Sequence, residues 1–398
     1  MLIADTHSDT LFALGVEGKK DVMITPERLR DGGVTLQVFA MFSGSKGNKG
    51  DYEAIARAEY EQVPGLIEAG LHQVMHPAEA KEDKLNFMLS IEGCEVFEKG
   101  ISAVRDWYDK GVRMAALVWN NPNSLGFPAK GGSTEGLTSY GLEVVREMQR
   151  LGMAVDTSHL NEAGFYDLFA KTDKPPMASH SCCTALRNHF RNLTDDQLRL
   201  MIREGGYVGV NFYPYFLTDN GKADIGDVVN HIDHICQLGG EKIVGFGSDF
   251  DGIECVPEGL EHAGKMPALI AALQARGYDQ DTIEGIAGKN LLAYYSRMHM
   301  RCARGSKMTK IGYSFTHFIK QIKIKSNARF IGDCKQMQYT VRATAKSHIA
   351  SKSIFDRFLI YNVSCANIIF YKIHYSHTCV LCKNGSFAAY CGDCSVTG

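Results

Sequence analysis

Short apolar segments in the N-terminal two thirds of the chain each run into a side chain that can bind a metal ion or carry a proton. These side chains are His7 and Asp9, then Glu92, His159, His180 and Asp249. Imidazole and carboxylate ligands without cysteine favour Zn²⁺ over Mg²⁺ or Ca²⁺. Two such cations about 3.5–4 Å apart can share a hydroxide and lower its pKa toward 7. The residue types therefore predict a hydrolase with two zinc ions.

The spacing of these side chains indicates how two cations would be shared. His7 and Asp9 lie two residues apart at the end of an expected strand, so they point alike and can hold one cation. His159 and His180 can complete a second site. None of the segments ends on lysine, and Glu92 has two oxygens, so we expect Glu92 to bridge the two cations.

The segments that position these side chains have the pattern of parallel strands alternating with helices. We expect strands near residues 2–6, 34–42, 87–91, 112–118, 153–158, 176–179, 206–212 and 243–248. We expect helices over residues 52–70, 138–150, 161–170, 194–204, 224–238 and 280–297. Polar residues at the carboxyl ends of several strands are typical of the catalytic face of a (β/α)8 barrel. A doubly wound open sheet is the alternative, but such a sheet gathers its ligands at a single crevice.

Length and charge divide the chain into two parts. A barrel needs about 250 residues, and the chain has 398. Residues 299–398 carry 15 Lys and Arg against 3 Asp and Glu, whereas residues 1–298 carry 28 against 42. We therefore expect a barrel over residues 1–298 and a basic C-terminal extension over residues 299–398.

Composition and apolar patterning indicate where the protein works. No apolar run approaches the roughly 18 residues that span a bilayer, and no signal sequence follows Met1. We expect a cytoplasmic protein without membrane association, whose cysteines are reduced. Cysteines within the barrel are interpreted as small buried hydrophobic residues; they are Cys94, Cys182, Cys183, Cys236 and Cys255.

Six short motifs occur in the order that is found in a known family. They are His7-Ser8-Asp9, Ser90-Ile91-Glu92-Gly93, Asp156-Thr157-Ser158-His159, Ser179-His180-Ser181, Arg191-Asn192 and the stretch from Gly245 to Gly252. Over about residues 1–297 the chain resembles the membrane (renal) dipeptidase family, and within it the soluble bacterial members. The resemblance implies a zinc-dependent dipeptidase with two zinc ions on an amidohydrolase-like (β/α)8 barrel.

The resemblance also implies a role for each metal ligand. His7 and Asp9 would hold one zinc, His159 and His180 would hold the other, and Glu92 would bridge them. A hydroxide between the two metals would attack the peptide carbonyl of a small dipeptide, with L-D dipeptides among the expected substrates.

Further residues take roles in the same reaction. Asp249 would accept the proton of the water and deliver it to the departing amine. Arg191 would bind the carboxylate of the substrate with its planar guanidinium, and Arg187 is a rival for this task. Tyr213 and Tyr215 follow the next strand and would close the pocket.

The chain departs from the better-known family members at one position. They carry a histidine at the end of the fourth strand, where this chain has Trp119. We expect Trp119 to pack the wall of the pocket, and Asn120 or Asn121 to supply a hydrogen bond to the substrate.

Near its end the basic extension holds two CxxC motifs. Cys379, Cys382, Cys391 and Cys394 have a spacing that can wrap one further structural zinc in a ribbon over residues 379–394. A weakly structured extension is the alternative.

Two other functions are compatible with parts of the sequence. One is a different binuclear metal hydrolase of amides or esters on the same barrel, although Arg191 favours a substrate with a free carboxylate. The other makes the barrel a carrier for the basic tail, which would act as a nucleic-acid or protein adaptor. The scattered Lys and Arg residues argue against a nucleic-acid partner. The sequence leaves open whether the chain forms a homodimer.

Overall fold

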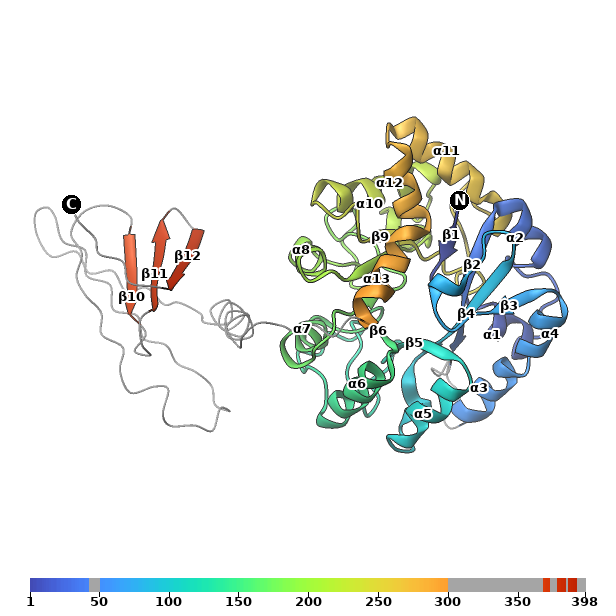
Figure 1. Ribbon diagram of the computed structural model, residues 1–398, viewed down its shortest axis with the longest axis horizontal. Helices are drawn as coiled ribbons and strands as arrows, with labels where there is room; N and C mark the ends of the chain where they lie inside the picture. Colours follow the sequence, from blue (N-terminus) through green and yellow to red (C-terminus); the bar gives the residue numbers. More distant parts are fainter. Residues whose placement is uncertain (43–50, 300–367, 373–377, 384–385, 392–398) are drawn as a thin grey trace, which may run out of the picture. The chain divides into compact units, whose positions relative to one another are not determined.

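The computed structural model of the chain describes residues 1–42, 51–299, 368–372, 378–383 and 386–391 (Figure 1). The chain divides into two compact units, Met1–Gly305 and Ser306–Gly398. The predicted domain boundary between residues 298 and 299 stays a prediction, since the chain from residue 300 to 367 lies outside the described residues.

Eight parallel strands of the first unit close into a barrel (Figure 1). They are β1 (Ile3–Asp5), β2 (Val34–Phe42), β4 (Leu85–Glu92), β5 (Val112–Ala116), β6 (Ala154–Asp156), β7 (Met177–Ala178), β8 (Tyr207–Val210) and β9 (Val244–Phe246). Each strand pairs with the next, and β9 pairs with β1, which closes the ring. The predicted (β/α)8 barrel is confirmed, and all eight expected strands are present. A short additional strand, β3 (Leu71–Gln73), pairs with the first half of β4 and was not predicted.

Helices surround the strands on the outside of the barrel (Figure 1). They are α1 (Thr10–Gly15), α2 (Pro26–Gly32), α3 (Tyr52–Tyr60), α4 (Val63–Glu68), α5 (Ser102–Asp109), α6 (Ser139–Leu151), α7 (Glu162–Lys171), α8 (Asp195–Glu204), α9 (Pro214–Leu217), α10 (Ile225–Gln237), α11 (Met266–Arg276), α12 (Gln280–Glu284) and α13 (Asn290–His299). The caps that the sequence carries explain several starts. Thr194, for example, forms a capping box with Gln197 and so fixes the first turn of α8.

Two of the predicted helices are interrupted. The helix expected over residues 52–70 is split into α3 and α4, because Pro64 has no N–H and cannot continue the hydrogen-bond ladder of α3. The helix expected over residues 280–297 contains a π-helical turn at Gly285–Lys289 between α12 and α13. This turn packs against β1, where a side chain at Gly288 would come within 2.9 Å of the carbonyl oxygen of Leu2.

Helix α13 closes the amino-terminal end of the barrel. Its Tyr294 and Tyr295 are buried, and their hydroxyls donate to the carbonyl oxygens of Pro175 (3.1 Å) and Arg113 (3.4 Å). They share one hydrophobic core with residues at the starts of the strands, such as Leu2, Met88, Met177 and Tyr207. A substrate must therefore approach the carboxyl ends of the strands, where the predicted ligands lie.

The described part of the second unit is a three-stranded antiparallel sheet. Its strands are β10 (Ile368–Lys372), β11 (Thr378–Lys383) and β12 (Ser386–Cys391). The register places Cys379 opposite Tyr390 and Cys382 opposite Phe387. Cys391 ends β12, whereas Cys394 lies outside the described residues. The zinc ribbon therefore stays a prediction.

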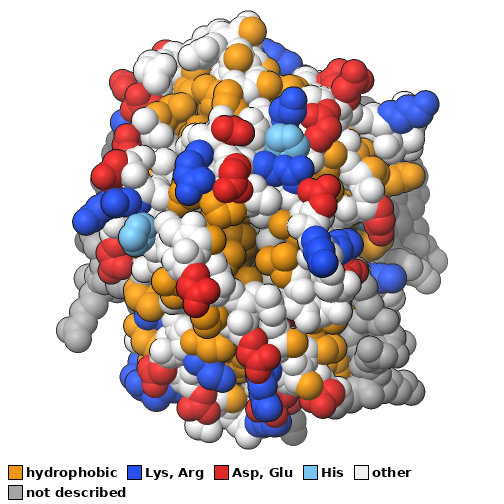
Figure 2. All heavy atoms as spheres, turned by 90° about the vertical axis from the view of Figure 1, so that its right-hand side faces the viewer, with side chains coloured by type: hydrophobic (Ala, Val, Ile, Leu, Met, Phe, Trp, Pro, Cys, Tyr) orange, Lys and Arg blue, Asp and Glu red, His pale blue; other side chains and the backbone are white. Residues whose placement is uncertain are grey.

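Among the described residues, no helix combines the length and apolar character needed to cross a membrane. On the face shown in Figure 2, acidic and basic side chains are interspersed around a hollow that contains hydrophobic side chains. Neither sign of charge dominates that face.

Candidate active site

Four of the predicted residues meet around the imidazole of His7, beyond the end of β1. The Nε2 atom of His7 lies 3.8 Å from Oε1 of Glu92, 3.8 Å from Oδ2 of Asp9 and 3.8 Å from Oδ1 of Asp249. Glu92 is the last residue of β4, and Asp249 follows β9. One histidine and three carboxylates thus converge on one point from three strands.

The remaining two histidines approach Glu92 from another side. Nε2 of His159 lies 2.9 Å from Oε1 of Glu92, and Nε2 of His180 lies 3.2 Å from the same oxygen. The rings of His7 and His180 are 3.8 Å apart, and those of His159 and His180 are 5.3 Å apart. The structure therefore brings all five predicted metal ligands and Asp249 together, with Glu92 between the two groups.

The donor atoms fit divalent cations. Nε2 of His7 and Nε2 of His180 are buried and lack a hydrogen-bond partner. A buried polar atom left in this state costs about 1–3 kcal/mol, which a bound cation would offset. Ligand atoms of His7, Glu92 and His180 lie within 4.8 Å of one another, and so do those of His7, Asp9 and Asp249. Both groups include His7, and the residues present therefore fit a metal centre at this place.

The gathered carboxylates make the centre strongly negative. Burial alone would lower the pKa of His7, but the charges of Glu92, Asp9 and Asp249 outweigh burial and raise this pKa to about 10. Burial also raises the pKa of Asp249 to about 7, and the charges of Asp9 and Glu92 add to this effect. At His159 burial dominates and lowers the pKa to about 4, which favours the neutral imidazole that binds metals.

Neighbouring side chains orient two of the histidine rings. Oδ1 of Asn120 lies 3.2 Å from Nδ1 of His159, and Oγ of Ser179 lies 2.8 Å from Nδ1 of His180. A histidine whose Nδ1–H is donated in this way keeps the lone pair of Nε2 for a metal. Asn120, which we predicted to bind substrate, is thus in hydrogen-bond contact with a candidate metal ligand.

The backbone is strained at the site. His159 (φ 67°), Asp249 (φ 65°) and Asp251 (φ 68°) adopt the left-handed conformation that residues other than glycine rarely adopt. Such conformations cost about 1–3 kcal/mol each and cluster at functional sites. Here they turn the chain sharply after β6 and β9. Next to them, a side chain at Gly252 would collide with Oδ2 of Asp9, so only glycine fits there.

Asp5 and Asp156 accept hydrogen bonds from the backbone of the segments that carry the candidate ligands. Oδ1 of Asp5 accepts hydrogen bonds from the backbone N–H of Ser248 (2.8 Å) and of His7 (3.4 Å). Oδ1 of Asp156 accepts from the backbone N–H of Ser158 (2.9 Å) and of Ser179 (2.8 Å). Both carboxylates are buried and lie directly before the metal-binding segments. These hydrogen bonds fix the main chain next to His7, His159 and His180.

The two candidate arginines differ in their surroundings. Arg191 is 5% exposed; its Nη2 lies 3.4 Å from the carbonyl oxygen of His180, and its buried Nε has no hydrogen-bond partner. It also lines a cavity of about 200 Å³. Arg187 instead forms a 2.7 Å ion pair with Asp219 and donates from Nε to the carbonyl oxygen of Tyr215. Arg191 is therefore the better placed to receive a carboxylate.

Trp119 lies beside the second group of histidines. Its ring centroid is 4.8 Å from that of Phe42, in an edge-to-face arrangement, and 6.1 Å from that of His159. Phe42 in turn packs edge-to-face on Phe12 at 5.3 Å. An aromatic row thus runs from α1 to His159, at the position where the family's histidine was expected.

Asn211 is a functional candidate that the sequence reasoning missed. It is fully buried just after β8, and its Nδ2 donates to Oδ2 of Asp249 at 2.9 Å. Its Oδ1 accepts from the backbone N–H of Tyr213, so one amide orients Asp249 and the start of α9 together. Tyr213 is half-buried, and its ring packs edge-to-face on Phe216 at 4.9 Å. The missed signal is a polar residue at the end of the seventh strand.

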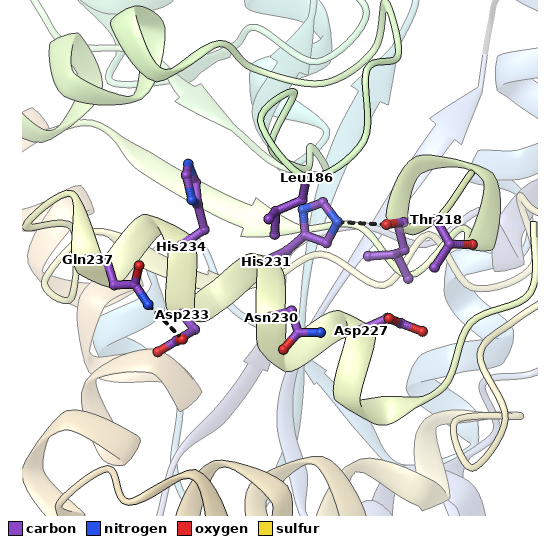
Figure 3. Close-up of a pocket in the computed structure, with 9 residues that line it drawn as sticks. Leu186, Thr218, Asp227, Asn230, His231, Asp233, His234 and Gln237 are labelled. Carbon is purple, nitrogen blue, oxygen red and sulfur yellow. Dashed lines mark hydrogen bonds between the residues drawn. The ribbon is translucent and has the colours of Figure 1, made fainter. Parts of the chain in front are cut away.

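A hollow of about 420 Å³ lies away from this centre, along α10 (Figure 3). His231 faces it, but both ring nitrogens are used: Nδ1 accepts from the backbone N–H of Cys183 and Nε2 lies 3.1 Å from the carbonyl oxygen of Leu217. His231 is 1% exposed, and the neighbouring His234 is half-buried and contacts Asp195 at 2.8 Å.

Relatives of this chain include dipeptidases. The profile of the membrane dipeptidase family (peptidase family M19) matches residues 1–300. Two uncharacterized dipeptidases of Schizosaccharomyces pombe are 31% and 33% identical; the alignments cover 77% and 73% of this chain, and 82% and 76% of theirs.

Solved structures agree. A metallo peptidase from Rhodobacter sphaeroides, bound to a phosphinate mimic of the dipeptide L-Ala-D-Ala, is 28% identical with a TM-score of 0.68, over 75% of this chain and 99% of that one. The dipeptidase AC, a metallo peptidase of family M19, is also 28% identical with a TM-score of 0.67, over 75% of this chain and 98% of that one. With its closed barrel and converging ligands, the chain belongs to the membrane dipeptidase family and is a metallo-dipeptidase.

Proposed function

We propose that the protein hydrolyses small dipeptides with two zinc ions at the carboxyl end of the barrel. His7 and Asp9 would hold one ion, His159 and His180 the other, and Glu92 would bridge both. The observation that carries this proposal is the convergence of three buried imidazoles on one oxygen of Glu92, at distances of 2.9–3.8 Å. Histidine nitrogens together with carboxylates are the donor set that zinc prefers over Mg²⁺ or Ca²⁺.

Asp249 is the group that would move protons. The bound cations would polarise the peptide carbonyl and activate water for attack on it. Asp249 would take the proton of that water and pass it to the departing amine. Burial and the charges of Asp9 and Glu92 raise the pKa of Asp249 in the metal-free site, whereas the bound cations would lower it and keep the carboxylate able to accept a proton. The amide of Asn211 holds one carboxylate oxygen and leaves the other facing His7.

Arg191 would select substrates with a free carboxylate. Its charge is buried, and its Nε lacks a partner, so a substrate carboxylate can complete its hydrogen bonding. This selects dipeptides over neutral amides or esters and disfavours the alternative of a general amide or ester hydrolase. The bound L-Ala-D-Ala mimic of the Rhodobacter sphaeroides relative supports the inclusion of dipeptides with a D-residue at the carboxyl side.

Tyr213 and Trp119 would form walls of the substrate pocket. Tyr213 sits at the start of α9, just after the strand that provides Asn211. Trp119 flanks His159, with their ring centroids 6.1 Å apart. Asn120 acts in this proposal on His159 and not on the substrate.

We also propose that the protein works in a reducing compartment such as the cytoplasm. All five cysteines of the barrel are free thiols, and three of them are buried. Oxidising compartments favour disulfides instead.

Elemental analysis of the full chain, paired with an assay of dipeptide hydrolysis, tests the main proposal. We expect two zinc ions bound by the barrel residues and loss of activity in Glu92→Gln. A third zinc, removed by Cys379→Ser, would identify the ribbon. Fewer than two metal ions in an active protein, or full activity in Glu92→Gln, would overturn the binuclear site.

A further inference from the structure

A chain of hydrogen bonds links a buried carboxylate to the imidazole of His180. Asp156 ends β6, and Ser179 follows β7 on the neighbouring strand. The hydroxyl of Ser179 donates a short hydrogen bond to Oδ2 of Asp156, while the backbone N–H of Ser179 donates to Oδ1 at 2.8 Å. Both oxygens of Asp156 are thus used by the same serine, and the hydroxyl proton of Ser179 points to the carboxylate.

The direction of this first bond fixes the second one. Oγ of Ser179 lies 2.8 Å from Nδ1 of His180. Because the hydroxyl proton is donated to Asp156, Oγ can only accept here, and Nδ1 of His180 must carry the hydrogen. The lone pair of His180 is then on Nε2, which lies 3.2 Å from Oε1 of Glu92. The backbone N–H of His180 donates to Oγ of Ser158 at 3.1 Å and fixes the main chain at the same place.

We propose that Asp156 and Ser179 are positioning residues that act on the metal through His180. Asp156 accepts the hydroxyl hydrogen of Ser179, which makes the serine oxygen a better acceptor for the Nδ1–H of His180. The imidazole ring therefore keeps one tautomer and is a stronger zinc ligand. Many metal-binding histidines donate their second nitrogen directly to a carboxylate, and here a serine stands between the two. The inference rests on the proposed function, in which His180 binds zinc.

The barrel contains a matched serine, Ser248, whose hydroxyl contacts the main chain of a candidate ligand, the carbonyl oxygen of His7 at 3.3 Å, and not an imidazole ring. Ser248 donates from its backbone N–H and its hydroxyl to the two oxygens of Asp5, at 2.8 and 2.6 Å. The oxygen of Ser248 accepts from the backbone N–H of Phe250 at 3.2 Å, in the place where Ser179 accepts from an imidazole. Ser248→Ala is therefore a control for Ser179→Ala. It removes a serine hydroxyl that joins two strands but does not contact an imidazole ring.

Zinc affinity of the full-length protein, measured by competition with a chromophoric chelator, tests the inference. We expect Ser179→Ala to weaken one of the two zinc ions by about 10- to 100-fold, the range for lost partners of metal-binding histidines. Asp156→Asn should weaken the binding of the same zinc ion less than Ser179→Ala does, because asparagine keeps the shape of the side chain and loses only its charge. Ser248→Ala should lower the melting temperature comparably, but leave zinc affinity within a few-fold of the wild type.

Two results would overturn the inference. One is wild-type zinc affinity in a folded Ser179→Ala protein, and the other is an equal loss of affinity in Ser248→Ala. If Ser179→Ala does not fold, the tautomer of His180 tests the inference instead. It can be determined from the NMR chemical shifts of the ring nitrogens in the zinc-free wild type, with the signals of His180 assigned by their loss in His180→Gln. Hydrogen on Nδ1 is the expected result, and hydrogen on Nε2 refutes the relay. A wild type that binds no zinc would instead refute the proposed function.

Discussion

Replacement of Arg191 should remove the preference of the enzyme for a free carboxylate. Arg191 and Arg187 lie four residues apart on the same loop, but only Arg191 is buried beside His180. Arg187 already has a carboxylate partner, Asp219, at 2.7 Å. Arg191→Met and Arg187→Met therefore remove the same charge from one loop in two different settings.

The size of the expected effect follows from the burial of Arg191. Truncating one partner of a buried, hydrogen-bonded charge pair costs about 2–5 kcal/mol. At 1.36 kcal/mol for each factor of ten, kcat/KM for a dipeptide should fall about 30- to 5000-fold in Arg191→Met. The ion pair of Arg187 is partly exposed to solvent and is worth about 0–1 kcal/mol, so Arg187→Met should change kcat/KM by less than about sixfold.

The assay should compare a dipeptide with its C-terminal amide in each variant. The wild type and Arg187→Met should prefer the free carboxylate, whereas Arg191→Met should cleave both substrates at similarly low rates. Zinc content is the control that separates substrate binding from damage to the metal centre. If Arg191→Met keeps two zinc ions and still prefers the free carboxylate by the wild-type factor, our assignment of Arg191 is refuted.

Three further results can be expected. Burial raises the pKa of Glu95 from about 4.5 to about 7, so the stability of the folded protein falls as pH rises through this window. The free energy of unfolding of Glu95→Gln, measured by chemical denaturation, should therefore rise by about 3 kcal/mol relative to that of the wild type between pH 4.5 and pH 8. A difference between the two proteins that does not change with pH would contradict this. Removal of zinc with a chelator should lower the melting temperature, because a ligand at 100 times its Kd contributes about 2.7 kcal/mol per site; an unchanged melting temperature after complete removal would argue against a buried site. Asn120→Ala should weaken zinc binding about 10- to 100-fold through His159, whereas a role in substrate binding would raise KM at unchanged zinc affinity.

Much of the barrel was predictable because its strands are short, buried and apolar. Runs such as Val34–Phe42 and Leu85–Glu92 are buried along nearly their whole length, so their hydrophobic character is continuous in the sequence. β3 was missed because Leu71–Gln73 has only one buried residue and pairs only with the first three residues of β4. The split between α3 and α4 was signalled by Pro64, which our pattern reading passed over.

The convergence of the candidate metal ligands was predictable from residue type and position, but their hydrogen-bond partners were not. His159 and His180 follow strands and carry groups that bind metals, so each is visible by itself. The contacts of Asn120 with His159 and of Asn211 with Asp249 join residues 39 and 38 positions apart, through loops whose course no local pattern specifies. The left-handed backbone at His159 and Asp249 is also invisible to propensity, because tertiary contacts impose it.

The order of the strands explains how Glu92 could bridge the two metal ions that we propose. β4 lies two strands from β1 on one side, with β2 between, and two strands from β6 on the other, with β5 between. At both β1 and β6 an aspartate accepts both the N–H and the hydroxyl of a serine from an adjacent strand, Ser248 for Asp5 and Ser179 for Asp156. The same pair of contacts therefore joins adjacent strands at β1 and at β6, on opposite sides of β4. Glu92 lies at the end of β4 and faces His7 as well as His159 and His180. Because its carboxylate has two oxygens, it can bridge the metal ions that these two groups of ligands would hold.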